Sequence, residues 1–423
     1  MSNLPKESFA EPVPQSTHFL YGGENRKISL DVARIHRPPS GSVRAPGEAV
    51  GVPALENAMD ELAEKLGMDP IVLRKKNLPD KHPEEGTPYA TRKYAECMDE
   101  GARRFGWDKR NKTPGGLVEG EWLIGHGMSG ASRVHNVGEA SARVTLKPDG
   151  TATVETDMTD IGTGTYTILT QIAAEMLGLP PEKVRTKLGD SALPKGPGSG
   201  GSWGASSSGS AVFLACEALR EKLCQRLGCE EGELTLKDGE AISGNKRTPL
   251  ADILSNEPIS AEGTFEPGDA QDSFVLAGYG AYFCEVAVNR HTGETRVRRM
   301  LGVYAAGRIL NEKTARSQCL GGMTWGIGTA LTEELVHDPR DGHIVNRDLA
   351  EYHVPVNLDV PQLDVVLLEE RDDAASLLQS KGIGELGFCG AAGAVVNAIY
   401  NATGVRVRDY PATLDKVIAG LPD

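Results

Sequence analysis

One carboxylate near the end of the chain stands inside a run of glycines. Glu385 lies in the segment Lys381-Gly-Ile-Gly-Glu-Leu-Gly387, and small residues typical of a closely packed helix start follow it. Glycine lets a backbone approach a ligand closely, and the free amides of a helix N-terminus attract anions. A carboxylate held there is a candidate general base. A glutamate that only complements the helix dipole would look the same in the sequence.

Two turns upstream share this design. Asp160-Ile-Gly-Thr-Gly-Thr165 precedes a helical apolar pattern over residues 166–178, and Gly198-Ser-Gly-Gly-Ser-Trp-Gly-Ala-Ser-Ser-Ser208 precedes another over residues 209–227. Three turns of this kind, each leading into a helix, predict a large polyanionic ligand bound by backbone amides and hydroxyls. The P-loop spacing is absent and the third glycine of a dinucleotide-binding fingerprint is missing, so these residues do not name the ligand.

The elements that must position these turns alternate between hairpins and helices. This mixture favours an α+β fold over a doubly wound parallel sheet. A polar stretch over residues 107–122 predicts a domain boundary. We expect helices at residues 53–66, 69–76, 94–105, 166–178 and 209–227 and from the Glu385 turn to about residue 400, and strands at 140–146, 152–156, 184–188, 282–288, 294–300 and 365–369.

Composition excludes several classes of protein. The 423 residues carry a formal net charge of −14, which argues against a nucleic-acid partner. There is no apolar run long enough for a membrane span, and the N-terminus does not resemble a signal peptide. The seven cysteines include no Cys-x-x-Cys pair and the nine histidines form no ligand pattern. We therefore expect no metal held by protein ligands.

Four motifs, taken in order, resemble those of one known family. They are Asp160–Gly164, Gly200–Ser206, Gly307–Arg316 and Ser380–Glu385. With the tail over residues 400–415, they resemble the molybdenum-binding subunit of the xanthine dehydrogenase/aldehyde oxidase family, above all its bacterial periplasmic aldehyde oxidoreductase branch. The resemblance implies molybdopterin-binding domains with mixed sheets, hairpins and packed helices. Residues 1–108 would be the C-terminal portion of the first domain, and residues 109–423 the second.

The resemblance also implies a cofactor, a reaction and partners. The cofactor is molybdopterin cytosine dinucleotide, whose pterin rather than the protein holds molybdenum. The expected reaction oxidises small-molecule aldehydes, aromatic ones in particular, to carboxylic acids with water as the oxygen source. Electrons pass to an iron–sulfur subunit and an FAD subunit. No nucleic acid or membrane is expected as a partner. The compartment would be the periplasm if the chain is co-exported with a signal-bearing iron–sulfur partner, and the cytoplasm otherwise.

Residue roles follow from the matching motifs. Glu385 would be the general base that deprotonates a hydroxide ligand of molybdenum. Arg133, in Gly130-Ala-Ser-Arg-Val, resembles an active-site arginine that orients the substrate or the oxyanion, and Arg44, in Val-Arg-Ala-Pro-Gly, matches an arginine that lines the site. Either arginine alone would more often be a surface or salt-bridge residue. The expected contacts with the pterin dinucleotide are Ile161, Gly162, Thr163, Gly204, Ala205, Arg308, Ile309, Leu310, Asn311, Glu312, Lys313, Thr314, Gln318, Lys381, Gly382, Ile383 and Gly384.

The chain departs from the family pattern in two ways. Molybdenum subunits of the family are much longer, so the resemblance implies that an N-terminal third to half is missing, and a separate chain could supply it. Trp325 stands where many relatives have a glutamine near the metal. Two alternatives to aldehyde oxidation stay open. One is hydroxylation of an N-heterocycle by the same chemistry, and the other is a truncated, non-catalytic remnant that serves binding or assembly.

Overall fold

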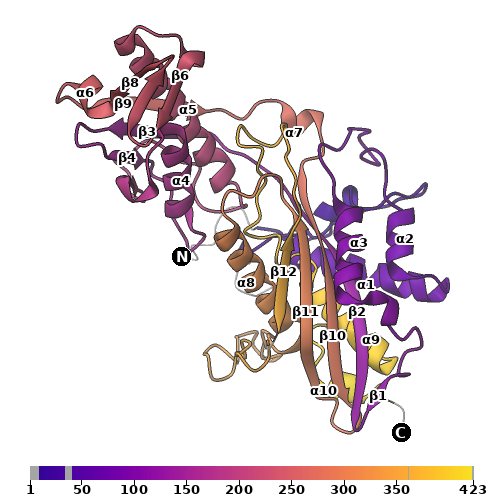
Figure 1. Ribbon diagram of the computed structural model, residues 1–423. Helices are drawn as coiled ribbons and strands as arrows, with labels where there is room; N and C mark the ends of the chain where they lie inside the picture. The colour runs from indigo at the N-terminus through magenta and orange to yellow at the C-terminus, as the bar shows by residue number, and fades with distance from the viewer. Residues whose placement is uncertain (1–8, 34–40, 361, 422–423) are drawn as a thin grey trace.

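Two lobes make up the protein, each built around its own β-sheet (Figure 1). The computed structural model describes residues 9–33, 41–360 and 362–421. Within these ranges no helix has the length and hydropathy that crossing a bilayer requires.

The larger lobe is organised by a five-stranded sheet. In spatial order its strands are β1 (Val118–Glu119), β2 (Trp122–Val134), β10 (Ala277–Asn289), β11 (Thr295–Ala305) and β12 (Leu363–Leu367). Neighbouring strands run antiparallel except β11 and β12, which are parallel. The long β10–β11 hairpin therefore forms the middle of the sheet, and β2 pairs with the whole length of β10.

Helices cover both faces of this sheet (Figure 1). On one face α3 (Tyr94–Phe105) packs on β10 and β11. On the other face lie α8 (Glu312–Leu331) and α9 (Ala391–Thr403). Against α9 and β2 packs α1 (Glu48–Lys65), which in turn contacts α2 (Pro70–Lys76). The sheet is thus the middle layer of the lobe.

The central strand β10 is buried on both faces because its side chains alternate between two cores. Tyr282, Cys284 and Val286 belong to the core under α8 and α9, whereas Ala281 and Phe283 belong to the core under α3. A strand buried on both faces reads as a nearly continuous apolar run. This hairpin is for that reason among the clearest signals in the sequence.

The smaller lobe has a four-stranded sheet. Its spatial order is β5 (Val184–Lys187), β4 (Ala152–Glu155), β3 (Ala140–Leu146) and β9 (Ile259–Phe265). Between the parallel strands β4 and β5 the chain passes through α4 (Thr165–Leu177). The longer α5 (Gly204–Leu227) packs on β3 and β9. Burial alternates strictly along β9, as expected for a sheet with one face covered by a helix and the other in solvent.

Short elements complete the chain. They are η1 (Gln15–His18), η2 (Trp107–Lys109), η3 (Pro181–Lys183), η4 (Glu231–Glu233), β6 (Leu234–Lys237), β7 (Glu240–Ser243), β8 (Lys246–Pro249), α6 (Leu250–Leu254), α7 (Ala270–Ser273) and α10 (Leu414–Ile418). β6, β7 and β8 form a small antiparallel sheet of their own.

The α+β expectation is confirmed, since both larger sheets mix strand directions and pack against helices. The helix expected over residues 94–105 has those bounds. The helix expected to begin at residue 209 begins at Gly204 instead, because the small residues after the Gly200 turn continue it. The expected strands 282–288 and 294–300 are longer in the structure, as β10 and β11.

The strand β2 was not predicted, because its glycines weaken the strand signal. These glycines let α9 lie against the strand. A Cβ at Gly125 would fall 2.1 Å from the carbonyl oxygen of Ala398, and one at Gly127 would fall 2.2 Å from the amide nitrogen of the same residue. The helix α9 is itself rich in alanine. Small residues on both elements therefore let the strand and the helix approach closely.

We predict that Gly127→Ala lowers the free energy of unfolding by about 1–3 kcal/mol, because the new methyl group would overlap the backbone of α9. Thermal and urea unfolding followed by circular dichroism would measure the loss. Gly268→Ala is the matched control, since no described heavy atom lies within 4 Å of its added Cβ. Equal stability of the two variants would contradict the close packing of α9 on β2.

Candidate functional site

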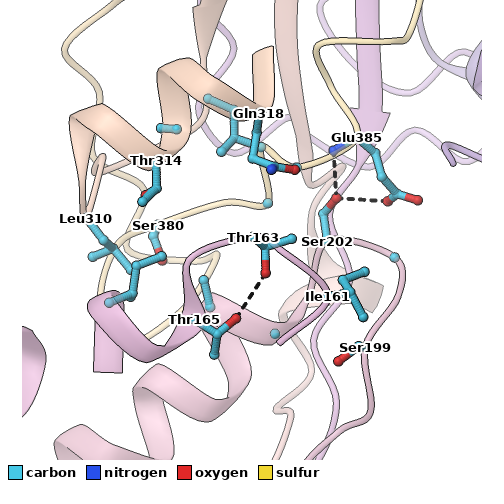
Figure 2. Close-up of a pocket in the computed structure, with 18 of the residues that line it drawn as sticks. Ile161, Thr163, Thr165, Ser199, Ser202, Leu310, Thr314, Gln318, Ser380 and Glu385 are labelled. Atoms are coloured by element: carbon cyan, nitrogen blue, oxygen red, sulfur yellow. Dashed lines mark hydrogen bonds between the residues drawn. The ribbon is translucent and has the colours of Figure 1, made fainter. Parts of the chain in front are cut away.

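A cavity of about 440 Å³ lies where segments distant in the sequence meet. The turns before α4 and α5, the helix α8 and the loop before α9 contribute to its walls (Figure 2). Among the described lining residues Glu385 is the one acidic side chain, whereas Arg44 and Arg308 are basic. The cavity therefore suits an anionic ligand and places a single carboxylate beside it.

Most residues predicted from the sequence meet in this cavity. Outside it lie Glu312 and Lys313, which are exposed in the first turn of α8. Gly162 is also absent from the described walls, and its carbonyl oxygen accepts a hydrogen bond from Gln318. The predicted residues that line the cavity are Arg44, Ile161, Thr163, Gly204, Ala205, Arg308, Ile309, Leu310, Asn311, Thr314, Gln318, Lys381, Gly382, Ile383, Gly384 and Glu385.

The carboxylate of Glu385 is held by three donors. Its Oε2 accepts hydrogen bonds from Nε of Arg133 and Oγ of Ser202, each at 2.9 Å. Its Oε1 accepts the backbone N–H of Ala45 at 2.9 Å. The Glu385 side chain is largely buried, so these bonds define a single orientation of the carboxylate.

Arg133 lies behind Glu385 rather than in the cavity wall. Its Nη1 lies 3.1 Å from both carboxylate oxygens of Glu48, whose side chain is fully buried. Burial lowers the pKa of Arg133, but Glu48 and Glu385 raise it, and the net shift is upward. Burial raises the pKa of Glu48, and the opposing effect of Arg133 does not cancel that rise. Arg133 thus links two carboxylates, and its guanidinium is already engaged.

Ser202 is a site residue that we did not predict individually. Its Oγ accepts the backbone N–H of Glu385 at 3.0 Å and donates to the carboxylate of the same residue (Figure 2). Ser202 has a φ of +58°, which is uncommon for a residue with a side chain. A Cβ at Gly382 would fall 2.4 Å from the Ser202 carbonyl oxygen, so the two loops touch through their backbones. The Gly200-Gly-Ser motif was the available signal.

Lys381 lines the cavity with its backbone, because its ammonium group points into the protein. Nζ lies 3.0 Å from Oδ2 of Asp372 and 2.7 Å from Oγ1 of Thr91. The side chains of Lys381 and Asp372 are almost completely inaccessible to solvent. Oε1 of the neighbouring Glu370 is buried and has no hydrogen-bond partner among the described residues. This buried pairing anchors the first residue of the loop over residues 381–387, hereafter the glycine loop.

His135 holds the next residue of that loop. Its Nδ1 accepts the backbone N–H of Gly382 at 3.1 Å, and Nε2 faces the carbonyl oxygen of Ala375 at 3.0 Å, so the neutral ring carries its proton on Nε2. Burial lowers the pKa of His135 to about 4, and the charge of Lys381 acts in the same direction. The sequence shows this histidine as part of no ligand pattern, whereas the structure makes it a support of the loop.

The helix N-termini at the cavity differ in their capping. Before α4, Asp160 accepts the backbone N–H groups of Gly162 and Thr163, so those amides serve the turn itself. Asn311 caps α8 by accepting the N–H of Thr314. In contrast, α5 has no side-chain cap, and its first two residues line the cavity. The amides at the start of α5 therefore suit an anionic group.

Further lining residues were not predicted as individual contacts. Hydroxyl groups among them lie near the starts of α4 and α5, where Thr165 bonds to Thr163 at 3.0 Å (Figure 2). Their clustering in two Gly/Ser/Thr-rich turns was visible in the sequence. The additional lining residues are Val43, Met158, Thr165, Ile168, Ser199, Gly200, Gly201, Ser202, Ala315, Trp325 and Ser380.

Arg44 closes the cavity beside Glu385. Its Nε donates to the carbonyl oxygen of Gly384 at 3.1 Å, and Nη2 donates to that of Gln318 at 2.9 Å. Burial lowers the pKa of Arg44, although its guanidinium remains charged at neutral pH. The guanidinium carbon lies 6.0 Å from the centroid of the Trp325 ring, which stacks on Phe388.

Two family models match the chain. Both are described as molybdopterin cofactor-binding domains, and they match residues 6–78 and residues 100–361. The chain belongs to the molybdopterin cofactor-binding family. This confirms the family resemblance found in the motifs.

Known relatives agree with this assignment. The chain is 48% identical over 422 residues to the aldehyde oxidoreductase molybdenum-binding subunit PaoC of Escherichia coli strain K12. The matched region covers all of this chain and 58% of that protein. The chain thus spans somewhat more than half the length of this relative. A probable hypoxanthine oxidase of the same organism, XdhD, is 31% identical over 95% of this chain and 44% of its own length.

The fold is similar to that of a solved structure. The structure of quinoline 2-oxidoreductase from Pseudomonas putida 86 superposes with a TM-score of 0.81 and 24% identity, over 90% of this chain and 53% of that one, which shows a shared fold. The two proteins therefore share this arrangement of sheets and helices.

The cavity residues fit a molybdopterin cofactor. The uncapped N-terminus of α5 and the basic residue Arg308 match a group that carries phosphates. Gly382 allows the backbone to pack where a Cβ would collide with Ser202. Because the pterin holds molybdenum, the cavity needs no cluster of protein ligands for the metal.

We predict that Arg133→Met lowers the free energy of unfolding by about 3–5 kcal/mol, because it leaves Glu48 buried without a counter-charge. Chemical unfolding would measure the loss, and adding Glu48→Gln to the same variant should restore part of it. Arg143→Met, which breaks an exposed pair with Glu262, should change stability by no more than about 1 kcal/mol. Equal losses for Arg133→Met and Arg143→Met would contradict the buried link.

We predict that protonation of His135 destabilises the folded protein in mild acid. The folded imidazole has a pKa of about 4 against an ordinary value of 6.5, so its stabilising contribution is complete above pH 6.5 and is lost as the pH falls to about 4. The contribution is about 3 kcal/mol. Unfolding free energies of the wild type and His135→Gln, measured across this range, should differ in slope. Parallel pH profiles would contradict the neutral His135.

Proposed function

We propose that this chain is the molybdenum-cofactor-binding part of an aldehyde oxidoreductase that oxidises aldehydes, aromatic ones in particular, to carboxylic acids. The decisive observation is the carboxylate of Glu385, held at the edge of the cavity by Arg133, Ser202 and the amide of Ala45. The 48% identity to an aldehyde oxidoreductase subunit supports the substrate class. Each turnover takes oxygen from water and releases two protons and two electrons with the carboxylic acid.

The proposed form of the cofactor is molybdopterin cytosine dinucleotide. When bound, it supplies the oxygen-transfer and two-electron redox chemistry. Gly204 and Ala205 would bind a phosphate through the amides of the α5 N-terminus. The turn at Ile161 and Thr163, the start of α8 and the glycine loop would supply further contacts. The roles of Gly162, Glu312 and Lys313, which lie outside the described walls, stay predictions.

Glu385 would act as the general base through Oε1. Its Oε2 already accepts two hydrogen bonds, from Arg133 and Ser202, whereas Oε1 accepts one, from Ala45. A carboxylate oxygen can accept two hydrogen bonds, so Oε1 retains a free lone pair. We therefore assign to Oε1 the removal of a proton during the reaction.

The two arginines would have different tasks. Arg133 would position Glu385, because its guanidinium already bonds to Glu385 and Glu48 and is only 4% exposed. Arg44, which lines the cavity, is the better placed of the two to contact a substrate oxygen. Its Nη1 is also close enough to α8 that a Cβ at Gly321 would fall 3.7 Å from it.

The remaining proposals concern the whole enzyme. Electrons would leave to an iron–sulfur subunit and an FAD subunit, and the compartment would be the periplasm if an exported partner carries the signal and the cytoplasm otherwise. The division of the chain into domains at residues 108 and 109 stays a prediction. N-heterocycle hydroxylation is the second candidate function, because the fold is also that of a quinoline oxidoreductase. A non-catalytic binding role is the third.

We predict that Glu385→Gln lowers kcat/KM for benzaldehyde about 10²–10⁴-fold, because the amide cannot accept the proton. Molybdenum and cytosine nucleotide content should remain at the wild-type level, since the backbone contacts persist. Steady-state kinetics with a dye acceptor and elemental analysis would provide both readouts. Glu266→Gln, at an exposed position, is the control and should keep wild-type kinetics.

Metal analysis and kinetics of the wild-type protein test the proposed function as a whole. Wild-type chain, produced alone and with partner subunits, should contain molybdenum and turn over aromatic aldehydes faster than N-heterocycles. Faster turnover of heterocycles would replace the proposal with the second candidate. Bound cofactor without turnover of either class would favour the binding role, and no molybdenum in any preparation would overturn the proposal.

A further inference from the structure

Trp325 is the one aromatic side chain among the described residues that line the cavity. Its ring lines the wall near the base and beside Arg44. Trp325 lies seven residues after Gln318 on α8, and therefore two helical turns along the same face of the helix. Gly321 stands between them without a side chain, so this stretch of α8 leaves room in front of Arg44.

The Trp325 ring is held on several sides. It stacks on Phe388 with ring centroids 5.1 Å apart and an angle of 18° between the planes. Phe388 follows Glu385 by three residues, and its N–H donates to the Glu385 carbonyl oxygen at 3.0 Å. The indole wall and the candidate base therefore belong to one packed unit.

Glu333 packs against α8 close to this unit. Its Oε2 accepts the hydroxyl of Tyr352 at 2.9 Å. Partial burial raises the pKa of Glu333, while hydrogen bonds from the side chains of Tyr352 and Trp325 oppose that rise. A Cβ at Gly328 would fall 2.0 Å from Glu333 Oε1, so this glycine admits the carboxylate against α8. The loop after α8 thus reaches the indole through Glu333.

From this arrangement we propose that Trp325 is a specificity-determining residue that binds the ring of an aromatic aldehyde, and that Glu333 and Tyr352 are its positioning residues. The inference rests on the proposed function and deepens it. A flat indole of fixed orientation offers an aromatic ring an offset-stacked or edge-to-face contact. An aliphatic aldehyde of similar reactivity gains little from such a wall. The chemistry at the carbonyl group is the same for both substrates.

Steady-state kinetics with benzaldehyde and propanal test the inference. Trp325→Ala should raise KM for benzaldehyde about 10-fold, with KM for propanal changed less than about twofold and kcat largely kept. Glu333→Ala should raise KM for benzaldehyde over that for propanal in the same way but more weakly. Glu333→Gln, which retains an acceptor, should keep the wild-type KM values. Trp122→Phe is the matched control, because Trp122 lies outside this cavity. Equal changes for both aldehydes would overturn the inference and leave the proposed function intact.

A binding readout is independent of turnover. Benzoate should quench part of the tryptophan fluorescence of the cofactor-free protein, and acetate at equal concentration should not. That part should disappear in Trp325→Phe and persist in Trp122→Phe. Quenching that is unchanged in Trp325→Phe would overturn the inference. A wild-type protein that oxidises no aldehyde would refute the proposed function, and this second readout would still decide whether the aromatic wall binds rings.

Discussion

The ion pair between Glu385 and Arg133 is the interaction on which the candidate site depends. Arg133 comes from the central sheet, Glu385 from the loop before α9, and Glu48, the second partner of Arg133, from the start of α1. Removing Arg133 would leave both carboxylates buried without a counter-charge, which is strongly unfavourable. The three charges therefore join three elements and also fix the carboxylate that faces the cavity.

The glycine loop is supported from behind by groups that never face a ligand. Lys381 extends into a buried pairing with Asp372, and His135 accepts the amide of Gly382. Ser202 approaches from the smaller lobe and bonds to both the backbone and the carboxylate of Glu385. Because these supports come from different parts of the chain, the loop has little freedom to rearrange, as a site that positions a base requires.

In the proposed function, cofactor binding and chemistry occupy different parts of one cavity. Hydroxyls and the uncapped start of α5 form the part suited to an anionic cofactor, and Glu385, Arg44 and Trp325 form the other end. The helix α8 spans both parts, with Thr314 near its start and Trp325 two turns beyond Gln318. A single helix thus sets the distance between the proposed cofactor contacts and the indole of Trp325.

The sequence by itself determined the local features: helices with clear apolar periodicity, the β10–β11 hairpin, and the turns whose glycines surround Glu385. Those signals come from residues that are close together in the sequence, so they can be recognised without knowledge of the fold. Only the tertiary structure decided that β2 is an interior strand of the sheet, since its glycines matter only through α9. Only the structure shows that Arg133 and the ammonium group of Lys381 bond to buried partners outside the cavity wall. Likewise, only the structure shows that His135 and Ser202 support the glycine loop. Which side chain meets which partner depends on residues far apart in the chain, and spacing along a sequence does not record that.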